Sequence, residues 1–107
     1  MTPNQLAADL RAARELVAAG WCQGAYARTK SGRPIGPRTP GAACFCPLGA
    51  AQRVVLAGGY RYAAMVDAMN AACPNYGIAH WNDTTGRRQA TVWKMLDRAI
   101  AAAEKSA

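Results

Sequence analysis

Cys46 is the candidate nucleophile of this chain, because it stands immediately before a predicted helix start at Pro47. The positive end of a helix dipole lowers the pKa of a nearby thiol and favours the reactive thiolate. A cysteine hydrolase or transferase also needs a base, a group that orients the base and a donor to an oxyanion. The candidates for these roles are His80, then Asn82 or Asp83, and Gln23.

A structural interpretation competes with this catalytic one. Free cysteine packs as a small apolar residue, and the Gly49 that follows Cys46 would allow close packing at a buried helix start. His80 is the only histidine, and no feature of the sequence places it beside Cys46. We therefore favour a packed thiol and keep the Cys46–His80 enzyme as the alternative.

The soft ligands of the chain allow a second kind of site. A tetrahedral zinc ion takes four Cys or His ligands, and four candidates are Cys44, Cys46, Cys73 and His80. However, the Cys-x-Cys spacing is shorter than the usual ligand spacing and is not repeated. A disulfide between Cys44 and Cys73, or between Cys22 and Cys46, is a further possibility. We predict no metal and no cofactor, with thiols kept reduced in a cytoplasm.

A cationic stretch follows the first predicted helix. The net charge of the chain is +7, and residues 21–46 contribute four cations and no acid. Guanidinium groups bind phosphates and carboxylates, so such a stretch favours nucleic acid or an acidic protein as partner. The predicted binding residues are Trp21, Gln23, Arg28, Lys30, Arg33, Arg38, Trp81, Asn82, Asp83, Arg87 and Arg88. The two tryptophans would serve as apolar anchors. A loop that is merely solvated is the structural alternative.

The run of residues 82–85, Asn-Asp-Thr-Thr, also has two interpretations. It could line a pocket together with Trp21 and Trp81. It could equally cap the last helix, because Asn, Asp and Thr side chains accept hydrogen bonds from the free N–H groups of a first turn. We favour capping.

Four helices are expected to position these residues. Thr2 would cap the first, in which Leu6, Leu10, Ala13 and Val17 recur at helical spacing up to a stop at Gly20. The second begins at Pro47, carries its stripe as far as Leu56 and ends at residues 58–59. The third covers about residues 60–72, and the last about residues 85–105. Glycine and proline are dense over residues 20–46, which predicts a long loop in which residues 25–29 could pair with 33–35 as a hairpin.

Length and composition place the chain in a broad class. Its 107 residues fit a single domain over 1–107. It contains no apolar run of the roughly 18–20 residues that a membrane span needs, and no signal-peptide pattern. We therefore expect a cytoplasmic, all-α domain of four helices with a long Gly/Pro-rich basic loop after the first helix.

Three strings give the chain a resemblance to a known family. They are residues 20–24 (Gly-Trp-Cys-Gln-Gly), residues 46–50 (Cys-Pro-Leu-Gly-Ala), and Trp-Asn-Asp at 81–83 with its continuation through Gly86-Arg87 to 96–100. Together they resemble a family of small domains of unknown function found in actinobacteria and their phages. The resemblance implies that the strings matter to the fold or to a shared site. Cys44 and His80 depart from its pattern.

From these observations we expect a small basic binding or regulatory module, phage- or prophage-encoded and intracellular, that contacts an acidic protein or nucleic acid. Its binding face would combine residues 21–46 with residues 80–88. The alternative is an enzyme that uses Cys46 with His80, and a structural protein of a virion remains a third class.

Overall fold

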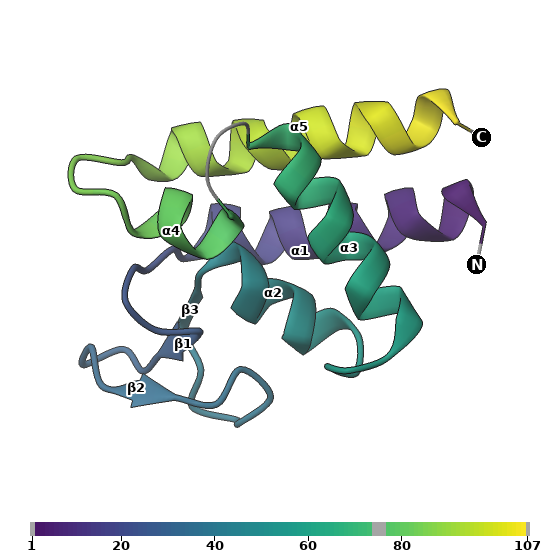
Figure 1. The fold of residues 1–107 in the computed structure, drawn as a ribbon. Helices are drawn as coiled ribbons and strands as arrows, with labels where there is room; N and C mark the ends of the chain where they lie inside the picture. The colour runs from purple at the N-terminus through teal and green to yellow at the C-terminus, as the bar shows by residue number, and fades with distance from the viewer. Residues whose placement is uncertain (1, 74–76, 107) are drawn as a thin grey trace.

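The computed structural model describes residues 2–73 and 77–106, which form five helices and a small three-stranded sheet. Helices α1 (Pro3–Ala19) and α5 (Gln89–Lys105) lie antiparallel along one side of the molecule, and α3 (Tyr60–Ala72) crosses them (Figure 1). The long loop, α2 (Pro47–Val54) and α4 (Ile78–Asp83) gather beside this pair. The molecule is mostly helical, as predicted, but α4 and the sheet exceed the four helices that we expected.

Helix α1 begins and packs as its sequence predicts. The Thr2 hydroxyl accepts a hydrogen bond from the Gln5 backbone N–H at 3.1 Å, which supplies the predicted cap. Leu10, Ala13 and Val17 are fully buried along one stripe. Because α5 buries Met95 and Leu96 at the same helical period, the two stripes face each other and form the centre of the core.

The basic loop is folded rather than merely solvated. Strand β1 (Ala27–Arg28) pairs antiparallel with β2 (Pro34–Ile35), which confirms the predicted hairpin. It also pairs with β3 (Cys44–Phe45), which the sequence did not indicate, so the strand order is β2-β1-β3. Arginines hold the rest of the loop: the Arg28 guanidinium donates to the Gln23 and Gly32 carbonyls, and Arg38 Nε donates to the Gln52 carbonyl at 2.8 Å.

Helix α2 starts where predicted and ends earlier. Cys46 is its N-cap, with the thiol sulfur accepting from the Gly49 N–H at 3.3 Å. The helix stops at Val54, so our extension of its stripe to Leu56 was wrong, and the Leu56 side chain is 72% exposed. Gly49 permits close contact with β1 and its flank, because a Cβ atom at this position would lie 1.8 Å from the Tyr26 carbonyl oxygen.

The last helix also begins later than expected, at Gln89 instead of about Thr85. Its N-cap is Arg88, which makes no side-chain capping bond, so the predicted capping role of the 82–85 run was wrong. Asn82 and Asp83 end α4 instead. Among the described residues, no helix has the length and apolar character needed to cross a bilayer.

Candidate functional site

A hydrogen-bond network joins the start of the loop to the end of α4. The Trp21 indole Nε1–H donates to Asn82 Oδ1 at 2.7 Å, and Asn82 Nδ2 donates to the Cys22 carbonyl at 3.2 Å. The Asn82 side chain is only 1% exposed. Because a buried amide must be satisfied, these bonds fix the distance between two segments that lie about sixty residues apart in the sequence.

The polar residues beside Asn82 extend this network towards solvent. Gln23 Nε2 donates to the Asn82 carbonyl at 2.8 Å and to the Thr84 carbonyl at 3.0 Å. The Gly24 N–H donates to Asp83 Oδ1 at 3.0 Å. The predicted site residues Trp21, Gln23, Asn82 and Asp83 are therefore brought together, largely through bonds to one another.

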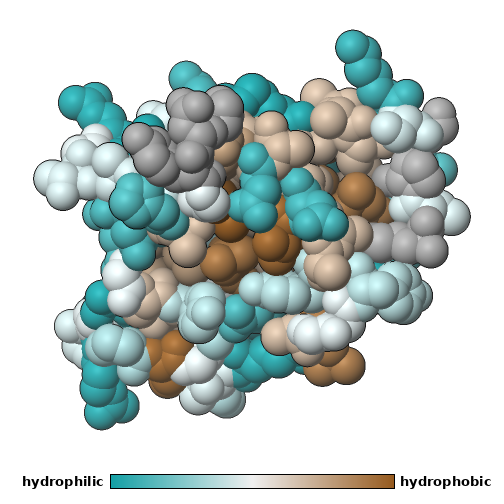
Figure 2. All heavy atoms as spheres, in the orientation of Figure 1, coloured by the Kyte–Doolittle hydropathy of each residue, from teal (hydrophilic) through white to brown (hydrophobic). Residues whose placement is uncertain are grey.

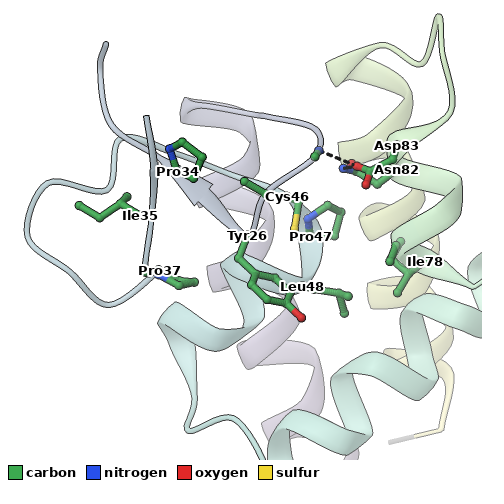
Figure 3. A pocket seen from close by; sticks show the side chains of 14 residues that line it. Tyr26, Pro34, Ile35, Pro37, Cys46, Pro47, Leu48, Ile78, Asn82 and Asp83 are labelled. Carbon is green, nitrogen blue, oxygen red and sulfur yellow. Dashed lines mark hydrogen bonds between the residues drawn. The ribbon is translucent and has the colours of Figure 1, made fainter. Parts of the chain in front are cut away.

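An apolar cleft opens where the loop, α2 and α4 meet. Its volume is about 710 Å3. Figure 3 shows three sets of side chains: α4 supplies Ile78, Asn82 and Asp83, the centre holds Tyr26 and Leu48, and the loop supplies Pro34, Ile35 and Pro37. Gly24, Ala25, Gly36, Cys46, Pro47 and Ala79 complete the lining. In the space-filling view, hydrophobic surface gathers at the centre of this side of the molecule between hydrophilic side chains (Figure 2).

The candidate nucleophile lies at this cleft but is not activated. Cys46 is buried, and burial raises the pKa of its thiol in spite of the hydrogen bond from the Gly49 N–H. The thiol is therefore protonated at neutral pH. His80 is exposed on α4 and does not line the cleft, whereas its neighbours Ala79 and Asn82 do. Of the proposed catalytic side chains, Cys46, Asn82 and Asp83 line the cleft, whereas His80 does not, and the Gln23 amide is bound to backbone carbonyls.

The remaining thiols also favour packing. All four cysteines are free in the structure. Burial raises the pKa of Cys22 to about 12, with contributions from the neighbouring thiols of Cys44 and Cys46, and raises the pKa of Cys73 to about 11. Within residues 2–73 and 77–106, no three His, Cys, Asp or Glu side chains are grouped so that they could hold a metal ion, so the zinc alternative gains no geometric support.

The predicted cations divide into two groups. Arg28 and Arg38 bind backbone carbonyls of their own chain. Arg87 Nε donates to the Trp81 carbonyl, and its guanidinium stacks 4.3 Å from the centre of the Trp81 ring. The other three, Lys30, Arg33 and Arg88, are exposed, as Arg38 also is in spite of its bond.

The two predicted anchors are less available than we expected. Trp81 belongs to the hydrophobic core and is 8% exposed. Trp21 is half-buried and packs against the core, with its indole N–H committed to Asn82. Neither ring lines the cleft, so the apolar contacts that the tryptophans were expected to make would fall to other side chains.

Sequence reasoning missed the residues that form the cleft walls. Tyr26, Ile35, Leu48 and Ile78 come from four different segments, and two of them lie between glycines and prolines where no periodicity identifies a shared face. The sequence contains one signal for these residues. The polar loop contains large apolar side chains but no helix against which they could pack. The exposed fraction of Tyr26, 52%, shows that such a residue need not join the core.

Comparison with known proteins identifies a family whose function is unknown. No curated protein matches the chain, and no solved structure matches it. One family model, described as a family of unknown function (DUF6197), matches residues 1–102. Since this match covers nearly all of the 107 residues, the chain belongs to the DUF6197 family of unknown function.

Proposed function

We propose that this protein is a small binding module and that its ligand site is the cleft between the loop and α4. The observation that carries the proposal is an open, mostly apolar cavity of about 710 Å3 on a small, well-packed body. Ligand sites are commonly clefts of about 300–1,000 Å3, lined by apolar side chains with a few polar groups. Tyr26, Ile35 and Leu48 supply the apolar walls, and Asn82 and Asp83 supply polar groups at one end.

The site is preorganised for binding. The hydrogen bonds of Asn82 hold α4 against the loop. Within the loop, the Arg28 guanidinium holds the Gln23 and Gly32 carbonyls in place. A ligand would therefore meet walls that are already in place and would pay little ordering entropy. The protonated, buried thiol of Cys46 supports binding over thiol catalysis, because the thiolate is the reactive species.

The proposal is tested with a neutral apolar probe. Indole titrated to millimolar concentration should produce saturable shifts in the amide NMR signals of residues 24–26, 35, 36, 46 and 48. Replacing Ala79 by phenylalanine fills the cleft from the exposed face of α4 and should remove those shifts. The matched control is Ala8→Phe, which places the same ring on an exposed position of α1. The absence of saturable shifts in the wild-type protein would overturn the proposal.

An acidic partner is a second candidate, supported by the cations that remain exposed. Lys30 and Arg33 lie in the hairpin turn just before Pro34, which lines the cleft, and Arg88 precedes α5. An acidic protein segment with an apolar side chain would fit this combination better than nucleic acid. Among the described residues that line the cleft, Tyr26 is the one aromatic ring for base stacking, and the guanidinium groups of Arg28 and Arg38 already donate to backbone carbonyls.

Two polymers distinguish these partners. An acidic peptide that contains leucine and a single-stranded DNA 20-mer would be titrated into the wild-type protein and the Lys30→Ser/Arg33→Ser double variant. Peptide binding that weakens in the double variant and is blocked by Ala79→Phe would support the acidic-protein partner. DNA binding that falls steeply with salt but ignores Ala79→Phe would favour nucleic acid instead. Equal binding by the wild-type and double-variant proteins would show that Lys30 and Arg33 do not contribute to partner binding.

The three sequence strings support a related proposal about cellular context. Their resemblance to actinobacterial and phage proteins suggests a phage- or prophage-encoded module that acts inside a bacterial cell. The genes that flank this one test the proposal directly: phage structural or regulatory genes on both sides would support it, and a conserved metabolic operon would contradict it.

A further inference from the structure

We propose that the cleft selects ligands that carry a protonated amine on an apolar body, with the amine pairing to the Asp83 carboxylate. This inference rests on the proposed function, because it assigns a ligand class to the same cleft. Its starting point is a contrast in charge. The whole chain carries a net charge of +7, yet among the described residues that line the cleft the one charged side chain is the acid Asp83.

The Asp83 carboxylate is oriented but not neutralised. Its Oδ1 atom accepts hydrogen bonds from the Gly24 N–H at 3.0 Å and from Asn82 Nδ2 at 3.1 Å. Both donors are neutral, and both bonds end on the same oxygen. The carboxylate is thereby fixed at the end of the cleft, and its Oδ2 atom retains the capacity to accept a bond from a ligand.

The ion pairs of the described residues do not involve this group. They use four of the other acids, Asp9, Glu15, Asp97 and Glu104. Arg87, the first cation after Asp83 in the sequence, is bound to the Trp81 carbonyl and stacked on the Trp81 ring. A cation supplied by a ligand would therefore pair with Asp83 without breaking an ion pair found among these residues.

Asp83 selects the charge of the ligand head group at short range only. The net positive charge of the molecule repels cations at long range, but salt screens this repulsion beyond about 10 Å at 0.1 M. Within the cleft, Ile78, Leu48 and Tyr26 contact the apolar body, and contact with Asp83 distinguishes the head group. An anionic head group placed at the same point would be repelled by the carboxylate.

Three ligands with one ring system test this inference. Indole, tryptamine and indole-3-propionate share the apolar body and are neutral, cationic and anionic at pH 7. At 0.1 M salt we expect tryptamine to bind about two- to fivefold more tightly than indole, which is the range of a solvent-accessible ion pair, and indole-3-propionate to bind more weakly than indole. The order of affinity in the wild-type protein is decisive by itself: the amine should bind most tightly, then the neutral ring, then the anion. Equal dissociation constants, or the reverse order, would overturn the inference.

A variant assigns the preference to one carboxylate. In Asp83→Asn, the amide oxygen can still accept from the Gly24 N–H, but the charge is gone, so the ratio of the indole to the tryptamine dissociation constant should fall to about one. The control Asp67→Asn removes an exposed acid from α3 and should keep the wild-type ratio. A preference that persists in Asp83→Asn would overturn the inference while leaving the cleft as a binding site. Failure of all three ligands to bind would overturn the proposed function itself.

Discussion

At the scale of single residues, Asn82 matters most to the site. Its side chain is buried and satisfies the Trp21 indole and the Cys22 carbonyl, which belong to a distant segment. An amide at this position therefore does more than fill space, because each partner loses its bond when the amide is removed. We predict that the residue controls both the stability of the fold and the position of α4.

Replacing Asn82 by alanine should lower the free energy of unfolding by about 1–3 kcal/mol, because partly buried polar partners would be left unsatisfied. Urea denaturation followed by tryptophan fluorescence measures this change. Gln23→Ala is the matched control: its amide bonds to the Asn82 and Thr84 carbonyls lie nearer to solvent, so water can replace them at a smaller cost. Equal losses in the two variants would contradict the central role of Asn82.

The buried thiols predict a loss of stability at alkaline pH. In the folded chain the pKa of Cys73 is raised to about 11 and that of Cys22 to about 12, from an ordinary value of 9.0, chiefly by burial. Above pH 9 the unfolded chain loses these protons while the folded chain keeps them. The stability that these two buried thiols contribute is therefore fully present below pH 9. It falls between pH 9 and about 11–12, by at most about 1.4 kcal/mol per pH unit for each thiol.

Chemical denaturation at a series of pH values measures this slope. The comparison is with Cys73→Ala, whose free energy of unfolding should fall less steeply between pH 9 and 11, because this variant lacks one of the two thiols. Parallel curves for the two proteins would show that Cys73 has no raised pKa in the folded state.

At the scale of elements, α2 can approach the β1 segment only because residue 49 is a glycine. A Cβ atom there would meet the Tyr26 carbonyl oxygen at 1.8 Å, and this backbone atom cannot rotate away. Tyr26 also lines the cleft. The packing of α2 against the loop and the shape of the cleft therefore depend on the same contact.

Gly49→Ala should destabilise the protein by at least about 2 kcal/mol, towards the upper part of the range for overpacked sites, and should weaken indole binding. Thermal unfolding and the NMR titration provide the two measurements. Gly77→Ala is the control, because a Cβ atom at residue 77 meets no atom within 4 Å and φ is −61° there. Its stability should stay within about 1 kcal/mol of the wild-type value, with any loss arising because alanine is a poorer N-cap of α4 than glycine. Equal stability of the two variants would show that the backbone at residue 49 adjusts freely.

Some elements could be predicted from the sequence, and the contacts between distant segments could not. Helical periodicity located α1 and α3 closely, and Cys46 with Pro47 located the start of α2, because these signals are local. The pairing of β3 with β1 and the bond from Asn82 to the Cys22 carbonyl join segments far apart in the chain. No local preference encodes such contacts, so the local pattern of the 82–85 run favours a cap.

The cleft was harder still to predict. Its walls combine single residues from separate segments, and Arg28 and Arg38, which we assigned to a partner, instead bind backbone carbonyls of the loop. The chain contains many carbonyls that could accept an arginine, and only the tertiary structure selects among them. The meeting of residues 21–24 with residues 82–84 could be proposed from the sequence, but the hydrogen bonds that hold them together could not be identified.

At the scale of the whole molecule, stability depends on the core between α1 and α5. Leu10 is fully buried there, and Leu10→Ala should cost about 2–5 kcal/mol through lost burial and the cavity left behind. Leu56→Ala removes the same atoms from a side chain that is 72% exposed and should change stability by less than about 0.5 kcal/mol. Denaturant unfolding of both variants tests the contrast, and a small effect at Leu10 would contradict the packing of this core.

The antiparallel arrangement of α1 and α5 has a practical consequence. The start of α1 and the end of α5 lie at one end of the molecule, whereas the loop and α4 lie towards the other (Figure 1). A tether, a surface anchor or a fused host protein joined near either of these helix ends would leave the cleft facing outward. The same geometry would let the domain be inserted into an exposed turn of a carrier protein with the cleft still open to solvent.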